Sequence, residues 1–325
     1  MNSIPSFGMI RKLFLSISSG GIFLWKALGK VALAAIVFFV LNLIVSVPIG
    51  IVAGIMDAMR NGANVTPESI TELLQSNPWL RTSSYMLSAA TGVVTAAILY
   101  YAMERDRAWT LGWKQRGWLP KGGLGLALGA LLIVLAFLIV WLFGGIRIVG
   151  AELTNEVAVA LLFDVFLFAS VAIGEEVFSR GYVYGVAKQA GGISAAVAVS
   201  SLLFALLHAN NPAVLSSAFP MLNLVLAGVM LALLREWSGG LWVPIGVHLT
   251  WNFVQGDVLG MAVSGVDTPS ILQVESANDF VSGGAFGLEG SFVVTLVTVG
   301  VSVWLALALR RRGTSAAGGR GSFPR

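Results

Sequence analysis

The chain alternates long apolar blocks with short segments that carry nearly all of its charged residues. Several blocks approach the ~20 residues that a helix needs to cross the hydrocarbon core of a membrane. The pattern predicts about eight transmembrane helices, two of them short or interrupted, in an all-α, polytopic membrane helix bundle. The predicted blocks are Val31–Met56, Ser84–Met103, Gly122–Phe143, Val157 onward past Ile173, Ile193–Leu207, Pro220–Leu234, Leu241–Phe253 and Gly290–Leu309.

Composition supports an integral membrane protein. Hydrophobic residues make up 57% of the chain and charged residues only 11%, whereas soluble domains carry roughly 25% charged residues. The absence of cysteine excludes disulfides, thiolate metal sites and a cysteine nucleophile. The net charge of +4 does not call for a nucleic-acid partner, because the distribution of the basic residues explains it.

The basic residues set the predicted topology. With the N-terminus in the cytoplasm, the cytoplasmic segments collect 17 of the 20 basic residues, and the outer segments hold Arg60, Arg81 and Arg147. An even helix count with both termini inside therefore satisfies the positive-inside rule. We expect a prokaryotic cell membrane protein whose oligomeric state the sequence leaves open.

The predicted organisation has six parts. Residues 1–30 form a cytoplasmic or interfacial segment, 31–156 the N-terminal transmembrane helices, and 157–255 a helical core. Residues 256–289 form an acidic extracytoplasmic loop, 290–309 the last transmembrane helix, and 310–325 a basic tail of low complexity that is expected to be disordered.

Ionisable residues inside apolar segments are costly and mark functional sites. Three segments contain them: Gly174–Gly181 with two glutamates and an arginine, Phe204–His208, and His248–Asn252. Residues four apart share a helix face, so Glu176 and Arg180 can pair. Phe204 then lies beside His208, and His248 beside Asn252. Glu175 points about 100° away from Glu176 and has no such partner.

Counting helical rise predicts which of these residues lie at the same depth. Glu175 lies roughly 20 Å above Lys188, and His208 roughly 22 Å above Ile193. Two antiparallel helices would therefore bring Glu175 and His208 together. His248 follows Leu241 by seven residues, so its helix must start deeper, for example through a re-entrant stretch at Ser238–Gly240.

These three motifs, in this order, resemble those of the CPBP intramembrane proteases, the family of the CAAX prenyl endopeptidases and the Abi-type membrane proteins. The likeness covers roughly Val157 to Gln255 and includes Arg180-Gly181 and the run Gly240–Ile245. Ser179 departs from the family, which often has an aromatic residue there.

The resemblance implies catalytic roles for Glu175, His208, His248 and Asn252. Glu175 would be the general base that activates a water, and His208 would help to hold that water. His248 and Asn252 would stabilise the oxyanion, and such donors in a dry site can each lower the barrier by ~3 kcal/mol. Glu176, Arg180 and Phe204 would be structural at the site.

Two points stay open at this stage. Glu175, His208 and His248 also match the donor set of a His₂Glu zinc site, although we expect no tightly bound metal and no other cofactor. Asp164 lies three helical turns before Glu175, and it either lines the same cavity or bonds a neighbouring helix, the second being favoured.

The resulting hypothesis is an intramembrane endopeptidase, a hydrolase that cleaves a membrane-associated or lipid-modified peptide with a glutamate-activated water. The main alternative is a non-catalytic membrane scaffold of the same fold, such as a bacteriocin self-immunity or regulatory protein. A proton- or ion-coupled transporter is a further alternative, although no inverted repeat favours it. The expected partners are the substrate and the lipid bilayer.

Overall fold

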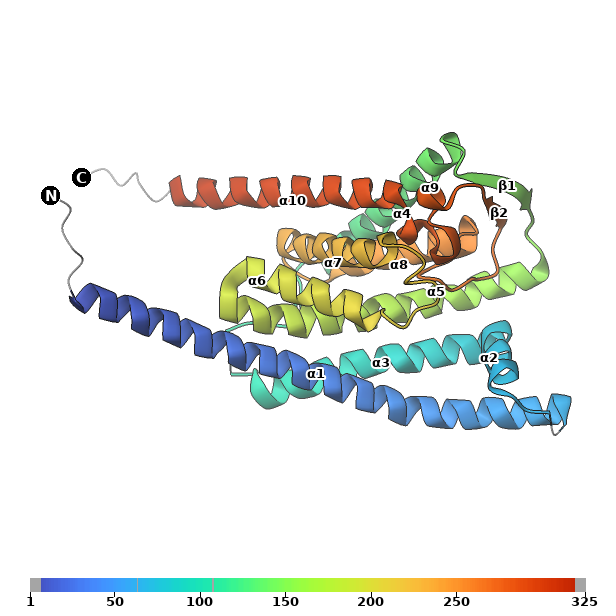
Figure 1. Ribbon diagram of the computed structural model, residues 1–325, viewed down its shortest axis with the longest axis horizontal. Helices are drawn as coiled ribbons and strands as arrows, with labels where there is room; N and C mark the ends of the chain where they lie inside the picture. The colour runs from blue at the N-terminus through green and yellow to red at the C-terminus, as the bar shows by residue number, and fades with distance from the viewer. Residues whose placement is uncertain (1–6, 63, 107, 319–325) are drawn as a thin grey trace.

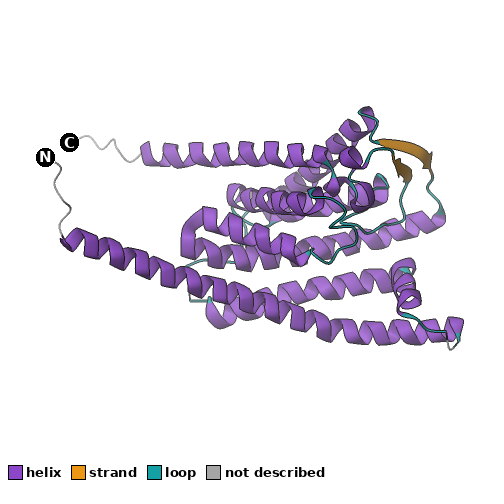
Figure 2. Ribbon diagram, in the orientation of Figure 1, coloured by secondary structure: helices purple, strands orange, loops and turns teal. Residues whose placement is uncertain are grey.

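The computed structural model describes residues 7–62, 64–106 and 108–318 and shows a bundle of long helices with one small sheet (Figures 1 and 2). The elements that form the bundle are α1 (Phe7–Asn61), α2 (Pro67–Ser76), α3 (Pro78–Met103), α4 (Trp118–Leu142), α5 (Asn155–Glu176), α6 (Tyr184–Leu207), α7 (Phe219–Ser238), α8 (Trp242–Phe253) and α10 (Phe292–Gly318). The predicted all-α membrane bundle is therefore confirmed.

All eight predicted apolar blocks lie in helices, but their boundaries differ from a simple series of eight spans. Within the described residues, six helical stretches are long and apolar enough to cross a membrane. One of them, Asn155–Leu207, contains two of the predicted blocks. The helix α8 has only 12 residues and is too short to qualify alone. The start of α1 and the end of α10 lie at the same end of the bundle (Figure 1).

The two ends of the chain differ from prediction. The helix α1 runs without a break from Phe7 to Asn61, so the expected separate segment before Val31 is part of one 55-residue helix. The helix α10 continues to Gly318, so the first part of the tail that we expected to be disordered is helical. Residues 1–6 and 319–325 lie outside the described part of the chain.

A glycine pair folds the stretch Asn155–Leu207 back on itself. Gly191 and Gly192 have non-helical dihedrals inside α6, and Gly192 has φ 72° and ψ −165°, a conformation that is essentially restricted to glycine. Tyr184 and Ala187 before the pair pack with Ala196 after it. The two arms therefore form an antiparallel hairpin, visible in yellow-green in Figure 1.

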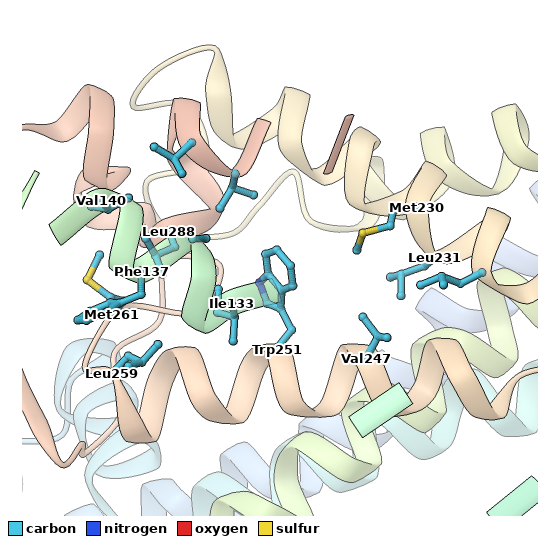
Figure 3. Close-up of a cluster of buried hydrophobic side chains, with 14 of the residues drawn as sticks. Ile133, Phe137, Val140, Met230, Leu231, Val247, Trp251, Leu259, Met261 and Leu288 are labelled. Atoms are coloured by element: carbon cyan, nitrogen blue, oxygen red, sulfur yellow. The ribbon is translucent and has the colours of Figure 1, made fainter. Parts of the chain in front are cut away.

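Small residues allow α4 and α8 to approach closely. A Cβ at Gly125 would lie 2.3 Å from the Val243 carbonyl oxygen, and one at Gly129 would lie 2.5 Å from that of Val247. Such contacts are typical of helix packing in lipid, where close backbone approach replaces the hydrophobic effect as the source of affinity. Beside this interface lies the largest buried cluster (Figure 3), which includes Ile133, Phe137, Val140, Met230, Leu231, Val247, Trp251, Leu259, Met261 and Leu288.

The segment after α8 is folded, although the sequence suggested only an acidic loop. A π-helical turn (Val254–Val258) leads to β2 (Leu272–Ser276), which pairs antiparallel with β1 (Ile146–Ala151). The short helices α9 (Asp279–Ser282), Gly284–Phe286 and Leu288–Gly290 follow. We call residues 257–290 the outer segment, and several of its side chains line the cavity described below.

Candidate active site

The two glutamates lie where α5 changes its helical form. The α-helix ends at Glu176 and continues as a π-helical segment, Val177–Val183, whose seven residues are all buried. A π-helical turn is rare and occurs often at functional sites, because the extra residue re-aims the side chains around it. Here Glu176 and Arg180 point into the protein with no exposed surface, while the Glu175 side chain is 31% exposed.

The glycine hairpin brings Glu175 next to His208. Each residue lies 16 positions from the nearer glycine of the turn, so the two arms place them at the same depth, as helical rise predicted. His208 Nε2 lies 3.6 Å from Glu175 Oε2. His208 Nδ1 is 2.8 Å from the Phe204 carbonyl oxygen, which can only accept a hydrogen bond. Neutral His208 therefore carries its proton on Nδ1 and presents an unprotonated Nε2 to Glu175.

The second histidine reaches the same point from α8. His248 Nε2 lies 3.8 Å from Glu175 Oε2, and His248 Nδ1 lies 3.0 Å from Glu176 Oε1. The helix α8 does start deeper in the bundle. Leu241, just before its first residue, lies beside Gly181, since a Cβ built at Gly181 would be 3.7 Å from the Leu241 side chain. The turn at Gly239, with φ 76°, and the loop contact Leu241 N–Gly112 O at 3.1 Å provide this offset.

Glu176 and Arg180 form the ion pair that their spacing predicted. Arg180 Nη1 donates to Glu176 Oε1 at 2.9 Å, and both side chains are fully buried. Arg180 Nη2 also donates to the Gly228 carbonyl oxygen of α7 at 3.2 Å, and the guanidinium lies 4.3 Å from the centre of the Phe204 ring. The pair thus joins three helices and holds His248 through Glu176.

Asn252 lies one helical turn beyond His248 and is 7% exposed. Its side chain lines the same cavity as Glu175, His208 and His248. Within the described part of the chain, no hydrogen bond to its amide group is found. The four residues to which the resemblance assigned catalytic roles are thus together around one space.

That space is a cavity of about 420 Å³ inside the bundle. Its walls are mainly apolar and aromatic side chains from α1, α3, α5, the π-helical segment Val177–Val183, α6, α7 and α8, among them Phe38, Phe168, Phe178, Leu231 and Trp251. A cavity of this size suits part of a peptide or lipid chain. Polar side chains also line it besides the four candidate catalytic residues, among them Asn42, Arg81, Asn211, Asn223 and Glu289.

One carboxylate in the cavity was missed by the sequence analysis. Glu289 of the outer segment lines the cavity and accepts hydrogen bonds from the Ser264 backbone N–H at 2.6 Å and from its hydroxyl at 2.7 Å. Burial raises the pKa of Glu289, and the Ser264 contacts and the charges of the two histidines oppose this rise. No motif marks Glu289, because its position depends on how the outer segment folds.

Asp164 bonds a neighbouring helix, which is the second of the two roles considered for it. Its carboxylate accepts two hydrogen bonds from Arg81 Nη2 at 2.7 and 2.6 Å, and it is fully buried. Arg81 is therefore inside the bundle, which corrects its assignment to an outer loop. Asp257, at the start of the outer segment, lies close by. Its pKa is raised to about 8, first by burial and then by the charge of Asp164.

Glu175, His208 and His248 have the donor types of a His₂Glu zinc site, and both Nδ1 atoms have the acceptors that metal-bound histidines usually have. In the described residues, however, no group of three or more His, Cys, Asp or Glu side chains is arranged to hold a metal ion. The zinc alternative stays a prediction, and the mechanism proposed below uses only residues of the chain.

Comparison with known proteins identifies the core of the chain. Residues 134–254 match the family model described as Type II CAAX prenyl endopeptidase Rce1-like. No curated protein matches the chain. The match begins inside α4, earlier than the motifs alone suggested, and it includes Glu175, His208, His248 and Asn252. Residues 134–254, which hold the helical core, are therefore similar to the Rce1-like type II CAAX prenyl endopeptidases.

Proposed function

We propose that the protein is an intramembrane endopeptidase that hydrolyses a peptide bond with a water activated by Glu175. The observation that carries this proposal is the convergence of His208 Nε2 and His248 Nε2 on Glu175 Oε2, at 3.6 and 3.8 Å, in the wall of an apolar cavity. Glu175 Oε2 is buried and has no hydrogen-bond partner in the described part of the chain. These separations are too long for direct hydrogen bonds and suit a bridging water.

The first step is nucleophilic attack by this water. One of its protons points to Glu175 Oε2 and the other to the unprotonated Nε2 of His208, which leaves an oxygen lone pair directed into the cavity. As the oxygen attacks the substrate carbonyl carbon, Glu175 takes the first proton. General base catalysis of this kind typically contributes 10²–10⁴-fold to the rate.

His248 and Asn252 stabilise the oxyanion that forms. His248 can donate from Nε2 while its Nδ1–H bonds to Glu176, which requires the imidazolium form, and the adjacent carboxylates favour that form. The Asn252 amide is one turn away and has no other partner in the described residues. The amine that leaves must be protonated, and Glu175 supplies the proton it took from the water.

The cavity indicates a substrate that reaches the site through the membrane. Phe38, Phe39 and Asn42 of α1 line it, and Phe39 is 54% exposed on the outer surface of the bundle. A membrane-associated or lipid-modified peptide can place an apolar part in this chamber and its peptide bond near Glu175. The family description points to the same class of substrate.

Loss of cleavage in site variants tests the proposal. Membranes from cells that express the wild type, Glu175→Gln, His208→Ala or the control Glu152→Gln are compared by mass spectrometry of new peptide termini. Glu152 lies outside the cavity lining, so its variant should match the wild type. We expect Glu175→Gln to lose roughly 10³-fold of cleavage, within the range that a general base contributes. Full activity in both site variants at equal expression would refute the protease and favour the scaffold.

A further inference from the structure

Three tryptophans form an aromatic cluster at the end of the bundle where α4 and α8 begin. Trp242 lies between Trp113 and Trp118, with ring centres 4.8 and 4.9 Å apart and interplanar angles of 44° and 43°. Trp113 and Trp118 remain 41% and 50% exposed. Tryptophan prefers the membrane–water interface, where an apolar ring and a polar N–H are both satisfied.

This cluster is one wall of an open pocket that is separate from the catalytic cavity. The pocket is lined by Trp113, Lys114, Gln115, Arg116, Trp118 and Trp242. None of these residues lines the cavity that contains Glu175. The proposed peptidase reaction therefore gives the pocket no role.

The pocket is preformed, because the loop that builds it is fixed to the turn between α7 and α8. Trp242 Nε1 donates to the Trp113 carbonyl oxygen at 3.0 Å. Gln115 Nε2 donates to the Ser238 carbonyl oxygen at 2.6 Å. Gly240 leaves room for this contact, since a Cβ there would lie 2.5 Å from the Gln115 side chain.

The charge in the pocket is uncompensated. Lys114 and Arg116 are exposed, and among the described residues no carboxylate lines the pocket. Neither residue forms an ion pair with the described part of the chain, whereas Arg105 in the same connection pairs with Asp106 at 3.6 Å. Two cations beside three indole rings attract an anion that also has an apolar part.

We propose that this pocket binds the headgroup of an anionic phospholipid. Lys114 and Arg116 would contact the phosphate, and the indoles of the tryptophan cluster would contact the glycerol backbone and the first acyl carbons. Beyond the pocket, α4 exposes leucines that recur at helical spacing along one face: Leu124, Leu131, Leu135 and Leu138. These leucines offer the acyl chains an apolar surface, which a free phosphate ion would not use.

Selective retention of lipid by the full chain tests the proposal. The protein is purified in detergent, given equal amounts of phosphatidylglycerol and phosphatidylcholine, and analysed by native mass spectrometry. Each basic residue near an anionic headgroup contributes roughly a fivefold preference, so Lys114→Gln with Arg116→Gln should lower the preference for phosphatidylglycerol about 25-fold. The exchange pair Lys114→Arg with Arg116→Lys should keep it.

A matched control removes the same charge elsewhere. Lys26→Gln with Arg105→Gln also deletes two exposed cations, and it should leave the preference unchanged. An equal loss in this control, or no loss in the pocket variant, overturns the proposal. Millimolar inorganic phosphate is then added as a competitor. If phosphate removes the preference for phosphatidylglycerol, the pocket is an anion site without lipid specificity, and the proposal is overturned as well.

Discussion

Replacing Arg180 by methionine should destabilise the protein strongly, because it leaves the Glu176 carboxylate buried without its cationic partner. Both side chains are fully buried, and Arg180 also contacts the Gly228 carbonyl oxygen and the Phe204 ring. Removing one member of a buried ion pair typically costs about 3–5 kcal/mol. A cost of about 4 kcal/mol corresponds to a roughly 10³-fold larger unfolded fraction.

The double variant Glu176→Gln with Arg180→Met separates the charge from the packing. It removes both charges together, so it should recover most of the stability that Arg180→Met loses, since replacing a whole buried pair is often nearly neutral. His248 Nδ1 would keep an acceptor in the amide oxygen of the introduced glutamine. The coupling energy of the double-mutant cycle should therefore be about 2–3 kcal/mol, within the range seen for residues in one network.

Reversible unfolding in mixed micelles, followed by tryptophan fluorescence, gives the free energies of unfolding for the wild type, both single variants and the double variant. If Arg180→Met costs less than about 1 kcal/mol, or if the two single costs simply add in the double variant, the assignment of this pair as a coupled structural unit is wrong.

Three further predictions concern stability and chemistry. Gly192→Ala should cost about 1–3 kcal/mol, although no atom lies within 4 Å of its Cβ; the control Gly300→Ala, inside α10 and equally uncrowded, should cost nothing, and equal unfolding free energies in the two variants would contradict this. Because the pKa of Asp257 is raised to about 8, the folded state holds a proton that the unfolded state releases near pH 4. The free energy of unfolding should therefore decrease as the pH rises from about 4 to 8, and Asp257→Asn should flatten this decrease. An unchanged pH dependence in the variant would disprove this prediction. For the metal question, we expect cleavage to survive chelator treatment, with less than about one zinc per ten chains by elemental analysis of the purified protein; full loss of cleavage on chelation, restored by zinc, would reverse that expectation.

The sequence was sufficient to predict the long apolar helices and the grouping of His208, His248 and Asn252 around the same space as Glu175. Both depend on local rules, namely the length of apolar blocks and the spacing of four residues that places side chains on one helix face. The depth match of Glu175 and His208 also followed from helical rise alone, because a single turn at Gly191–Gly192 separates them.

The parts that were wrong or missed depend on contacts between distant segments. Arg81 looked like an outer-loop residue because its buried partner, Asp164, lies 83 positions away. Glu289 carries no local signal, since the outer segment reaches the cavity through its own fold and through the bonds to Ser264. The deeper start of α8 was predicted, but the contact that accompanies it, from Leu241 N to the Gly112 carbonyl oxygen, joins residues 129 positions apart and has no local signal.

The glycine hairpin also fixes the order in which the site is assembled during synthesis. Glu175 and His208 belong to one pair of neighbouring helices, so they can meet as soon as that pair has entered the membrane. His248 follows His208 by 40 residues, which takes about 2–8 s at ribosomal rates of roughly 5–20 residues per second. During that interval, the nascent chain contains Glu175 and His208 but not yet His248 and Asn252. The mechanism proposed above therefore requires that α8 arrive before hydrolysis can begin, after most of the chamber wall is already in place.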